Sequence, residues 1–278
     1  MKTAIITGAA SGLGRELAIQ LKSTGYTLCL WDIQQLPLEA LAKELSADFT
    51  VIDISKNTEI VSAFAHFQNK HSTLDIFINC AGISITGAAQ NLEEADWERI
   101  LNINLKGSIL CATTALRQMQ KQKHGKIVNI ASIFGLIPAP SAIAYATSKH
   151  ALVGFSKTLE IEARSDGVEV YTICPGFIQS PFFQNAHYIG VSKDTMLQKQ
   201  PPSIPVKIAA NQIMTHIHGS KHWLIFPFSA KFLIFLDKYL PWLSYKLLSQ
   251  SWNDFQNISK IQNHSTQNHS TQNNSHAE

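Results

Sequence analysis

Short apolar runs alternate with helical patterns over most of this 278-residue chain, and this alternation restricts the fold more than any other feature. Several runs are apolar at nearly every position, which is typical of strands covered on both faces. Repeated strand–helix alternation predicts a parallel sheet between two layers of helices. The predicted strands are 4–7, 28–31, 49–54, 74–80, 126–131, 168–174 and 223–226. The predicted helices are 12–23, 35–46, 57–70, 96–122, 143–165 and 205–218.

Right-handed crossovers between parallel strands leave few topologies for such a chain. The leading one is an α/β fold of three layers, the doubly wound Rossmann fold with a seven-stranded parallel sheet. We assign residues 1–228 to this dinucleotide-binding and catalytic domain, with a substrate loop at about 181–204. Residues 229–256 are predicted to form an apolar, amphipathic helical extension, and residues 257–278 a disordered polar tail.

The composition bears on partners and location. The chain is 45% hydrophobic, enough to bury a sizeable core, and its net charge of +3 comes without a basic stripe, so no nucleic-acid partner is indicated. Cys29, Cys80, Cys111 and Cys174 form no CxxC pair, which argues against a zinc site or a disulfide framework and suits a reducing compartment. The apolar run 4–6 is too short for a signal peptide. We expect a cytoplasmic location and no bound metal.

A glycine-rich turn, TGAASGLG at 7–14, follows the first predicted strand and precedes the first predicted helix. Gly8 permits a tight turn, Gly12 allows backbone to approach a phosphate, and Gly14 allows close packing of helix on sheet. The helix N-terminus adds free N–H groups and the positive end of a dipole. Although the spacing is not GxGxxG, the position between strand and helix favours a pyrophosphate site over a plain connection.

Asp32 ends the second predicted strand, where a carboxylate can accept hydrogen bonds from the ribose hydroxyls of an adenosine. The same carboxylate would repel a 2′-phosphate, and no Arg or Lys lies at 9–11 or 33–35 to neutralise one. The sequence therefore favours NAD(H) over NADP(H). Capping of the following turn by Asp32 is the structural alternative.

Tyr145 and Lys149 stand four residues apart on a predicted helix, so their side chains share one face. A free tyrosine, with a pKa of about 10, is a poor base at neutral pH. A nearby ammonium favours the phenolate and is expected to lower that pKa. Such a pair suits proton transfer in the interconversion of an alcohol and a carbonyl compound. Taken alone, the spacing also fits an ordinary helix surface.

These features occur together with further motifs, in order, and the chain resembles the NAD(P)-dependent short-chain dehydrogenase/reductase family over about residues 1–228. TGAASGLG matches the family's cofactor loop and Tyr145 with Lys149 its YxxxK motif. The other matches are Asp53 with Ile54 after the third strand, Asn79-Cys80-Ala81-Gly82 for NNAG, Asn104 and Ser132 for the active-site residues, and Pro175-Gly176-Phe177-Ile178-Gln179-Ser180 for PGxxxT. Cys80 and Ser180 depart from the pattern; we expect Cys80 to pack as a small hydrophobe, and Ser180 keeps the hydroxyl.

The resemblance implies a role for each matching residue. Tyr145 would donate or accept the proton. Lys149 would lower the pKa of Tyr145 and hold the nicotinamide ribose, and Ser132 would bind the substrate oxygen. Asn104 would position a water that links Lys149 to solvent. Ser132 and Tyr145 would contact the substrate. The implied cofactor-binding residues are Gly8, Ser11, Gly12, Leu13, Gly14, Asp32, Asp53, Ile54, Asn79, Ala81, Gly82, Tyr145, Lys149, Pro175, Gly176, Ile178 and Ser180.

We therefore expect an oxidoreductase that interconverts an alcohol and a ketone or aldehyde. The substrate loop carries Phe182, Phe183, Met196 and Leu197, which suits an apolar, lipid- or steroid-like substrate but equally a lid packed on the core. A 3-oxoacyl thioester reductase of lipid synthesis is the alternative enzyme, and an NAD-binding regulator without activity is the alternative from another class. The resemblance also implies a homodimer or homotetramer, formed through the helices at 96–122 and 143–165.

The segment 223–248 is rich in aromatic and aliphatic residues, interspersed with lysines, and Pro241 should break or kink it. Three interpretations remain open: packing over the pocket or at a subunit interface, contact with a membrane surface, and a true span, which its charges disfavour. The QNHST repeat from residue 262 has no apolar residue, and we expect its histidines to be solvated and not metal ligands.

Overall fold

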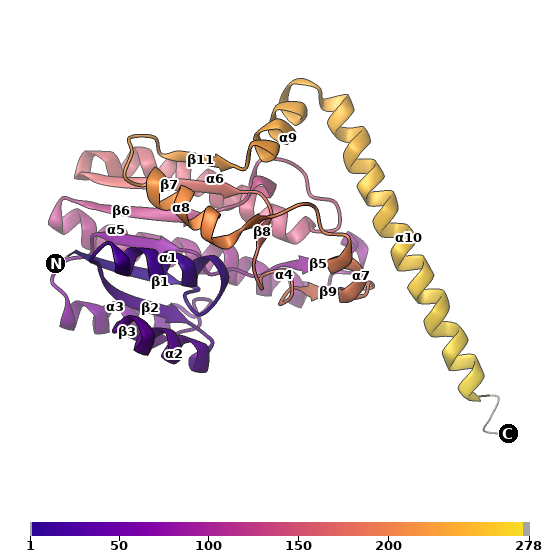
Figure 1. Cartoon of the computed structure of the whole chain (residues 1–278), viewed down its shortest axis with the longest axis horizontal. Coiled ribbons are helices and arrows are strands. Elements are labelled where there is room, and N and C mark those ends of the chain that lie inside the picture. The colour runs from indigo at the N-terminus through magenta and orange to yellow at the C-terminus, as the bar shows by residue number, and fades with distance from the viewer. Residues whose placement is uncertain (1, 275–278) are drawn as a thin grey trace.

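The computed structural model describes the backbone of residues 2–274 and the side chains of residues 2–260. Its centre is a seven-stranded sheet in which all neighbouring strands are parallel, in the order β11-β7-β6-β4-β1-β2-β3 (Figure 1). This order confirms the predicted doubly wound sheet. The strands are β1 (Thr3–Thr7), β2 (Thr27–Asp32), β3 (Asp48–Val51), β4 (Ile76–Asn79), β6 (Gly125–Ile130), β7 (Val168–Pro175) and β11 (Trp223–Phe226).

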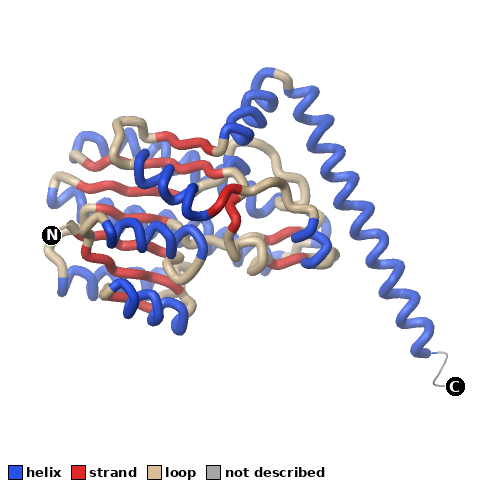
Figure 2. Tube along the Cα trace, in the orientation of Figure 1, coloured by secondary structure: helices blue, strands red, loops and turns tan. Residues whose placement is uncertain are grey.

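Helices cover both faces of the sheet, and alternate residues of the strands supply the two cores (Figure 2). In β1, Ala4 and Ile6 pack toward one helical layer and Ile5 toward the other, as the two-residue period of a strand requires. The first layer contains α1 (Gly12–Ser23), α2 (Gln35–Leu45) and α8 (Val206–His216). The second contains α3 (Asn57–Lys70), α5 (Ser108–Gln122) and α6 (Ile143–Ala163).

The predicted helix 96–122 is divided in the structure. It consists of α4 (Glu94–Leu101), a π-helix η2 (Asn102–Gly107) and α5. A Cβ on Gly107 would lie 2.4 Å from the carbonyl oxygen of Ile54, so only glycine allows this approach. The widened turn buries Asn104 completely and presents it to the loop that follows β4. An uninterrupted helix was therefore the wrong prediction, because apolar periodicity does not reveal a π-bulge.

Short elements connect the sheet to the substrate loop. Two small parallel ladders join β5 (Ile85–Thr86) to β9 (His187–Tyr188) and β8 (Ile178–Gln179) to β10 (Ile204–Pro205). The segment between β9 and β10 includes α7 (Lys193–Gln198). Three single-turn 3₁₀ elements complete the body, η1 (Ala89–Asn91), η3 (Ile133–Gly135) and η4 (Arg164–Asp166). The substrate loop is thus held to the body at both of its ends.

The C-terminal extension forms two helices, α9 (Phe228–Tyr239) and α10 (Pro241–Asn274). The break falls at Pro241 as predicted, and proline is well placed as the first residue of a helix. Helix α10 runs along one side of the molecule (Figure 1). No helix among the described residues has the length and apolarity needed to cross a membrane.

The predicted boundary of a disordered tail at residue 257 is too early. Phe255 and Ile258 are buried, and Ser259 Oγ donates a hydrogen bond of 2.9 Å to the carbonyl of Gly190. The hydrogen bond of Ser259 connects this part of α10 to the loop after β9, which the sequence pattern alone did not show. The predicted tail extends to residue 278, and residues 275–278 lie outside the described part of the chain.

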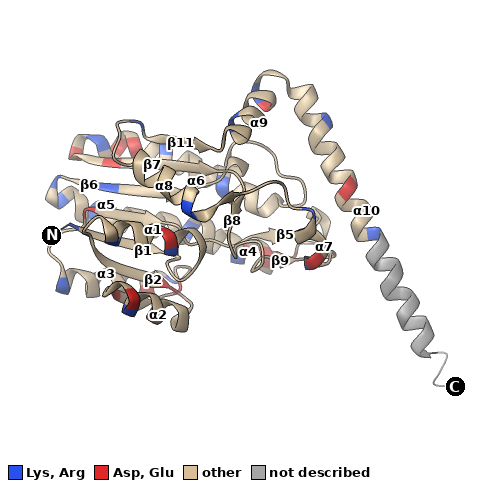
Figure 3. Cartoon of the chain, viewed as in Figure 1, with Lys and Arg blue, Asp and Glu red and all other residues tan. Residues whose placement is uncertain are grey.

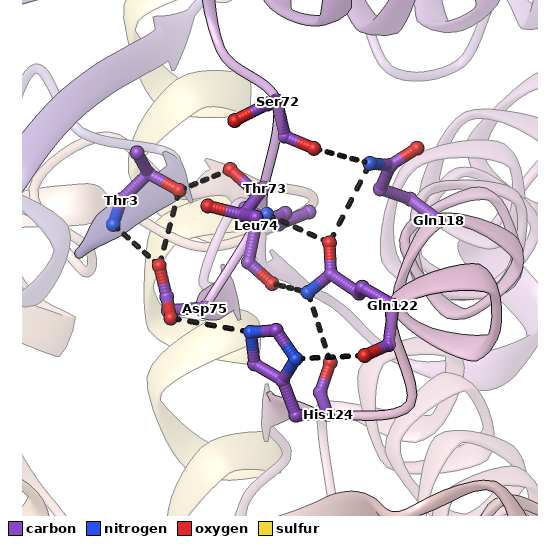
Figure 4. A network of polar contacts seen from close by, with 8 residues as sticks. All are labelled: Thr3, Ser72, Thr73, Leu74, Asp75, Gln118, Gln122 and His124. Atoms are coloured by element: carbon purple, nitrogen blue, oxygen red, sulfur yellow. Dashed lines mark hydrogen bonds and ion pairs between the residues drawn. The ribbon is translucent and has the colours of Figure 1, made fainter. Parts of the chain in front are cut away.

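Polar side chains join the loops at the amino ends of the central strands (Figure 4). Thr3 N–H donates to Asp75 Oδ2 at 2.7 Å, and His124 Nε2 lies 3.6 Å from Asp75 Oδ1. The Gln122 side chain donates to Leu74 C=O at 2.7 Å and accepts from Leu74 N–H at 3.1 Å. This network connects β1, β4 and β6 at the end of the sheet opposite the glycine turn.

Candidate active site

A cavity of about 280 Å³ lies at the carboxyl ends of the central strands, where doubly wound sheets bind their ligands. Nearly all of the site residues predicted from sequence line it. They are Gly8, Ser11, Gly12, Leu13, Gly14, Asp32, Asp53, Ile54, Ala81, Gly82, Ser132, Tyr145, Lys149, Pro175, Gly176, Ile178 and Ser180. The strand ends bring these residues together from positions spread over more than half of the chain.

The glycine turn is shaped as its sequence predicted. Gly8 and Gly12 have φ of +69° and +52°, in the region that favours glycine. A Cβ on Gly14 would lie 2.1 Å from the carbonyl oxygen of Gly8, so this residue lets α1 pack directly on the turn. Ser11, the N-cap of α1, makes no side-chain capping bond to the first turn. The helix therefore presents its N-terminal end to the cavity without a built-in cap, which fits the phosphates of a dinucleotide.

Two carboxylates lie at the end of the cavity where the sequence predicts an adenosine to bind. Asp32, at the end of β2, is 8% exposed and accepts hydrogen bonds of 2.9 Å from the N–H groups of Ala10 and Gln34. These two bonds fix the carboxylate against the glycine turn and leave each oxygen able to accept another bond. Asp53 accepts from the N–H of Ser55 at 2.9 Å. Both the capping role and the ribose-binding role expected of Asp32 are compatible with this geometry.

Tyr145 and Ser132 meet at the other end of the cavity. Tyr145 lies in the first turn of α6, and Ser132 follows β6 as the N-cap of η3, where its Oγ accepts from Phe134 N–H at 3.1 Å. Burial raises the pKa of Tyr145 to about 12, and a hydrogen bond with Ser132 opposes this shift. The sequence had predicted a lowered pKa for this phenol. That prediction was wrong for the structure described, because loss of hydration outweighs the favourable interactions.

Lys149 lies one helical turn after Tyr145, with its Nζ 5.7 Å from the centroid of the tyrosine ring. The ammonium donates a hydrogen bond of 2.9 Å to Ile130 C=O at the end of β6. Burial lowers the pKa of Lys149 to about 8. The lysine therefore titrates near neutral pH, and its charge in the cavity depends on pH.

Asn104 and Asn79 were predicted to belong to the site but do not line the cavity. The Asn104 amide bonds both backbone groups of Ile83, at 2.8 and 2.9 Å, and donates to Ser148 Oγ at 3.2 Å. It thereby fixes the loop that carries Gly82 beside Lys149. The Asn79 amide donates to Ser108 C=O at 2.8 Å and to Asn129 Oδ1 at 3.1 Å, so it connects the end of β4 to α5 and β6. Both side chains therefore connect segments whose neighbouring residues line the cavity.

Sequence reasoning missed an aromatic wall beside Tyr145. The ring of Phe134 lies 5.7 Å from that of Phe177, which stacks at 5.6 Å on Phe183. Phe182 continues the row, 5.3 Å from Phe183 and 5.8 Å from Tyr145. Phe182 and Phe183 had been placed in the substrate loop. Phe134 follows Ser132 by two residues, and Phe177 lies inside the PGxxxT-like motif, so their places next to matched motifs were the available signal.

The remaining candidates are placed as follows. Cys80 lines the cavity and packs against the core, and loss of hydration raises its pKa to about 12, which agrees with its predicted role as a small hydrophobe. His187, a residue of the substrate loop that the sequence indicates as part of the lid and not as a catalyst, is half exposed in β9, with Nε2 3.9 Å from Asp96 Oδ1. Met196 and Leu197 lie in α7 and do not line the cavity.

The doubly wound sheet, uncapped glycine turn and buried Ser–Tyr–Lys arrangement together define an NAD(P)-dependent oxidoreductase. Residues 2–188 match the family model described as short chain dehydrogenase, and the chain belongs to this family. A 3-oxoacyl-[acyl-carrier-protein] reductase FabG from Chlamydia trachomatis is 33% identical over 185 residues, which are 64% of this chain and 75% of that protein. The D-beta-hydroxybutyrate dehydrogenase of Rhizobium meliloti is 32% identical over 190 residues, 66% of this chain and 74% of that protein.

Solved structures give the same fold. A short-chain dehydrogenase/reductase from Burkholderia phymatum, in complex with NAD, superposes with a TM-score of 0.78. The match covers 86% of this chain and 95% of that one at 23% sequence identity. At this identity the likeness establishes the arrangement of strands and helices, while the chemistry of this chain follows from its own side chains and its family.

Proposed function

We propose that this enzyme interconverts a bulky apolar alcohol and its ketone, with NAD(H) as the preferred cofactor. The observation that supports the substrate class is the aromatic row from Phe134 to Phe182, which lines the cavity and ends beside Tyr145. A row of phenylalanines offers apolar contact and no charged partner, so it suits a hydrocarbon skeleton. The substrate carbonyl would then lie against Ser132 and Tyr145.

In the reducing direction, Tyr145 Oη donates its proton to the substrate oxygen while Ser132 Oγ donates a hydrogen bond to the same atom. A pKa of about 12 keeps the phenol protonated at neutral pH, as a proton donor must be. When bound, the nicotinamide cofactor would supply hydride-transfer chemistry at the carbonyl carbon. After transfer, the phenolate on Tyr145 is stabilised by the charge of Lys149 and by the bond with Ser132. Oxidation of the alcohol uses the same groups in reverse.

The residues present fit a dinucleotide. The uncapped end of α1 and the missing Cβ of Gly12 give the phosphates access to backbone N–H groups. Asp32 supports the preference for NAD(H), since it is held facing the cavity by Ala10 and Gln34 and would repel a 2′-phosphate. We expect Asp32→Ala to lose discrimination between NADH and NADPH, measured as the ratio of kcat/KM values. A ratio equal to that of the wild type would contradict the ribose-binding role.

A second substrate class has specific support. The sequence relatives include 3-oxoacyl-[acyl-carrier-protein] reductases at 31–33% identity, so a 3-oxoacyl thioester is the alternative. The direct test measures oxidation of NADH with cyclic and long-chain ketones, a sterol ketone and a 3-oxoacyl thioester. Higher kcat/KM for the apolar ketones is expected. Turnover confined to the thioester would favour the alternative, and absence of turnover with every compound would contradict the proposal.

The aromatic wall allows a sharper form of this test. Phe134→Ala removes the first ring of the row and should raise KM for a bulky ketone several-fold while leaving that for acetone nearly unchanged. Phe49→Ala, on the exposed side of β3, is a matched control for loss of a phenyl group. Equal effects of Phe134→Ala on both substrates would argue against hydrophobic recognition by this wall.

We further propose that the enzyme works in the cytoplasm as a homodimer or homotetramer joined through α5 and α6. All four cysteines are free, which suits a reducing compartment. Ile161 of α6 is 77% exposed, so its side chain is available for contact with a partner helix. Sedimentation velocity of the wild type and of Ile161→Arg tests this interface. A monomeric wild type would contradict it.

A further inference from the structure

The outward face of α9 carries a stripe of aromatic side chains. Phe228, Phe232, Phe235 and Tyr239 follow one another at spacings of four, three and four residues, which places them on one side of the helix. All four are exposed, with Phe228 at 81%. On the opposite side of α9, Ala230 is buried and Ile234 packs against the same cluster of the body. The helix thus has two apolar sides, and the body of the enzyme covers only one of them.

The same surface continues onto the start of α10. Trp242 and Tyr245, three residues apart, are 68% and 75% exposed, and Leu247 is also exposed. Nine of the seventeen exposed large hydrophobic residues in the described part of the chain fall between residues 228 and 247. Isolated exposed hydrophobes are normal, but this concentration on one corner marks an interaction surface. We call residues 228–247 the aromatic corner.

Positive charge accompanies the exposed rings. Figure 3 shows lysine or arginine positions along α9 and at the start of α10. Lys231, Lys238 and Lys246 are all exposed and, within the described structure, make no ion pair. The single acidic residue of the aromatic corner, Asp237, accepts a hydrogen bond of 2.8 Å from Ser244 Oγ. With three lysines and a single carboxylate, the aromatic corner has a net positive charge. Exposed Trp, Tyr and Phe with interspersed Lys are the combination found where helices lie in a membrane interface.

We propose that the aromatic corner binds the surface of an anionic lipid bilayer, with α9 and the first turns of α10 lying in its interface. A second copy of the chain suits this surface less well, because a two-fold contact would bring two sets of unpaired lysines together. Anionic headgroups neutralise those lysines while the rings enter the boundary between headgroups and acyl chains. Neither helix has to cross the bilayer for this mode of binding.

The aromatic corner also adjoins the cavity. The buried side of α9 packs through Ala230 on Ile133 and Ile137, with Phe134 and Ile234 against the same cluster. Ile133 and Phe134 line the cavity, so a single layer of side chains separates the docking helix from the substrate wall. The membrane surface would thus be both the support of the enzyme and the source of its substrate. This second part rests on the proposed apolar substrate, whereas the docking itself does not.

Vesicle co-sedimentation of the full-length protein tests the docking. We expect the wild type to pellet with vesicles of phosphatidylglycerol and phosphatidylcholine, and the Phe228→Gln/Trp242→Gln/Tyr245→Gln variant to bind at least about tenfold more weakly. Lys231→Gln/Lys238→Gln/Lys246→Gln should weaken binding to anionic vesicles by about fivefold per lysine and affect neutral vesicles little. Leu36→Gln/Val61→Gln removes exposed aliphatic residues of α2 and α3 and should bind like the wild type.

Several outcomes would overturn the proposal: a wild type that stays in the supernatant, equal pelleting of the wild type and the aromatic variant, or equal loss in the α2/α3 control. Sedimentation velocity without lipid tests whether a second copy of the chain binds the aromatic corner instead. If the wild type is an oligomer and the aromatic variant is a monomer, the aromatic corner is a contact between copies and the membrane proposal is overturned. Thermal unfolding verifies that each variant is folded. Turnover of a vesicle-dissolved ketone relative to a water-soluble one tests substrate delivery separately. Failure to turn over any ketone would reject the proposed substrate but leave the binding result valid.

Discussion

The two ends of the central sheet carry similar polar side chains in contrasting surroundings. At the amino ends, Thr3, Asp75 and Gln122 belong to a network in which side chains and loop backbone satisfy one another (Figure 4). At the carboxyl ends, Tyr145 and Lys149 face a cavity walled largely by apolar side chains. Burial shifts both pKa values toward the neutral forms, to about 12 for the phenol and about 8 for the ammonium.

This contrast separates stabilising polar groups from reactive ones. A hydrogen bond that is complete within the protein holds loops together and leaves little to offer a ligand. A buried group with incomplete solvation is costly to charge, so a ligand that supplies the missing charge or hydrogen bond gains more from it. Mutation of polar residues at the amino ends should therefore lower the stability of the fold. Mutation of polar residues at the carboxyl ends should lower the activity. Three predictions test this division.

The largest effect is expected at Tyr145. Tyr145→Phe removes the proton donor and keeps the ring beside Phe182, so ketone reduction should fall by on the order of a thousandfold. Binding of NADH, followed by fluorescence titration, and the thermal midpoint should remain close to those of the wild type. Tyr26→Phe, just before β2 and outside the cavity lining, is the matched control and should keep its activity. Substantial turnover by Tyr145→Phe would contradict the assigned mechanism.

The charge of Lys149 predicts the pH dependence. Its pKa is lowered from 10.5 to about 8, so the ammonium is lost as pH rises through about 8, while the phenol of Tyr145 stays protonated up to about 12. The kcat/KM of ketone reduction should then decrease above pH 8, approaching tenfold per pH unit for the loss of one proton. Lys149→Arg retains its charge at these pH values and should move the decline upward by more than one pH unit. An unchanged decline in that variant would assign it to another group.

The sequence predicted most of the site because its chemistry depends on fixed local spacings. The turn at Gly8–Gly14 and the carboxylate of Asp32 lie at strand–helix junctions, so strand and helix patterns placed them at one edge of the sheet. The Tyr145–Lys149 spacing was ambiguous alone and was assigned through the resemblance to the family, because the other motifs occur with it in order. The aromatic wall arises differently. Phe134 and Phe177 come from loops after β6 and β7, and their contact depends on the path of those loops in space.

Sequence reasoning failed where tertiary burial decided the outcome. A pattern cannot report that hydration is lost around Tyr145, so it predicted the wrong direction for the pKa. Apolar periodicity likewise gave one helix over 96–122, although the segment that contains Asn104 is a π-helix whose Gly107 lies directly against Ile54. For residues 223–248 the alternatives remained open because an amphipathic pattern does not say what covers its apolar side. The structure shows body contact on one side of α9 and exposed rings on the other.

The smallest effect is expected at the amino ends of the sheet. Gln122→Ala leaves the N–H and C=O of Leu74 without their side-chain partner, and the partly exposed site allows water to replace some of these bonds. We expect the free energy of unfolding in urea to fall by about 1 kcal/mol. Activity at a temperature well below the transition should stay unchanged, because the network lies at the end of the sheet opposite the cavity. Lys121→Ala, the exposed neighbour on α5, controls for the helix itself. A loss of activity in Gln122→Ala without loss of stability would mean that the two ends of the sheet are coupled, and the division between stabilising and reactive polar groups would have to be abandoned.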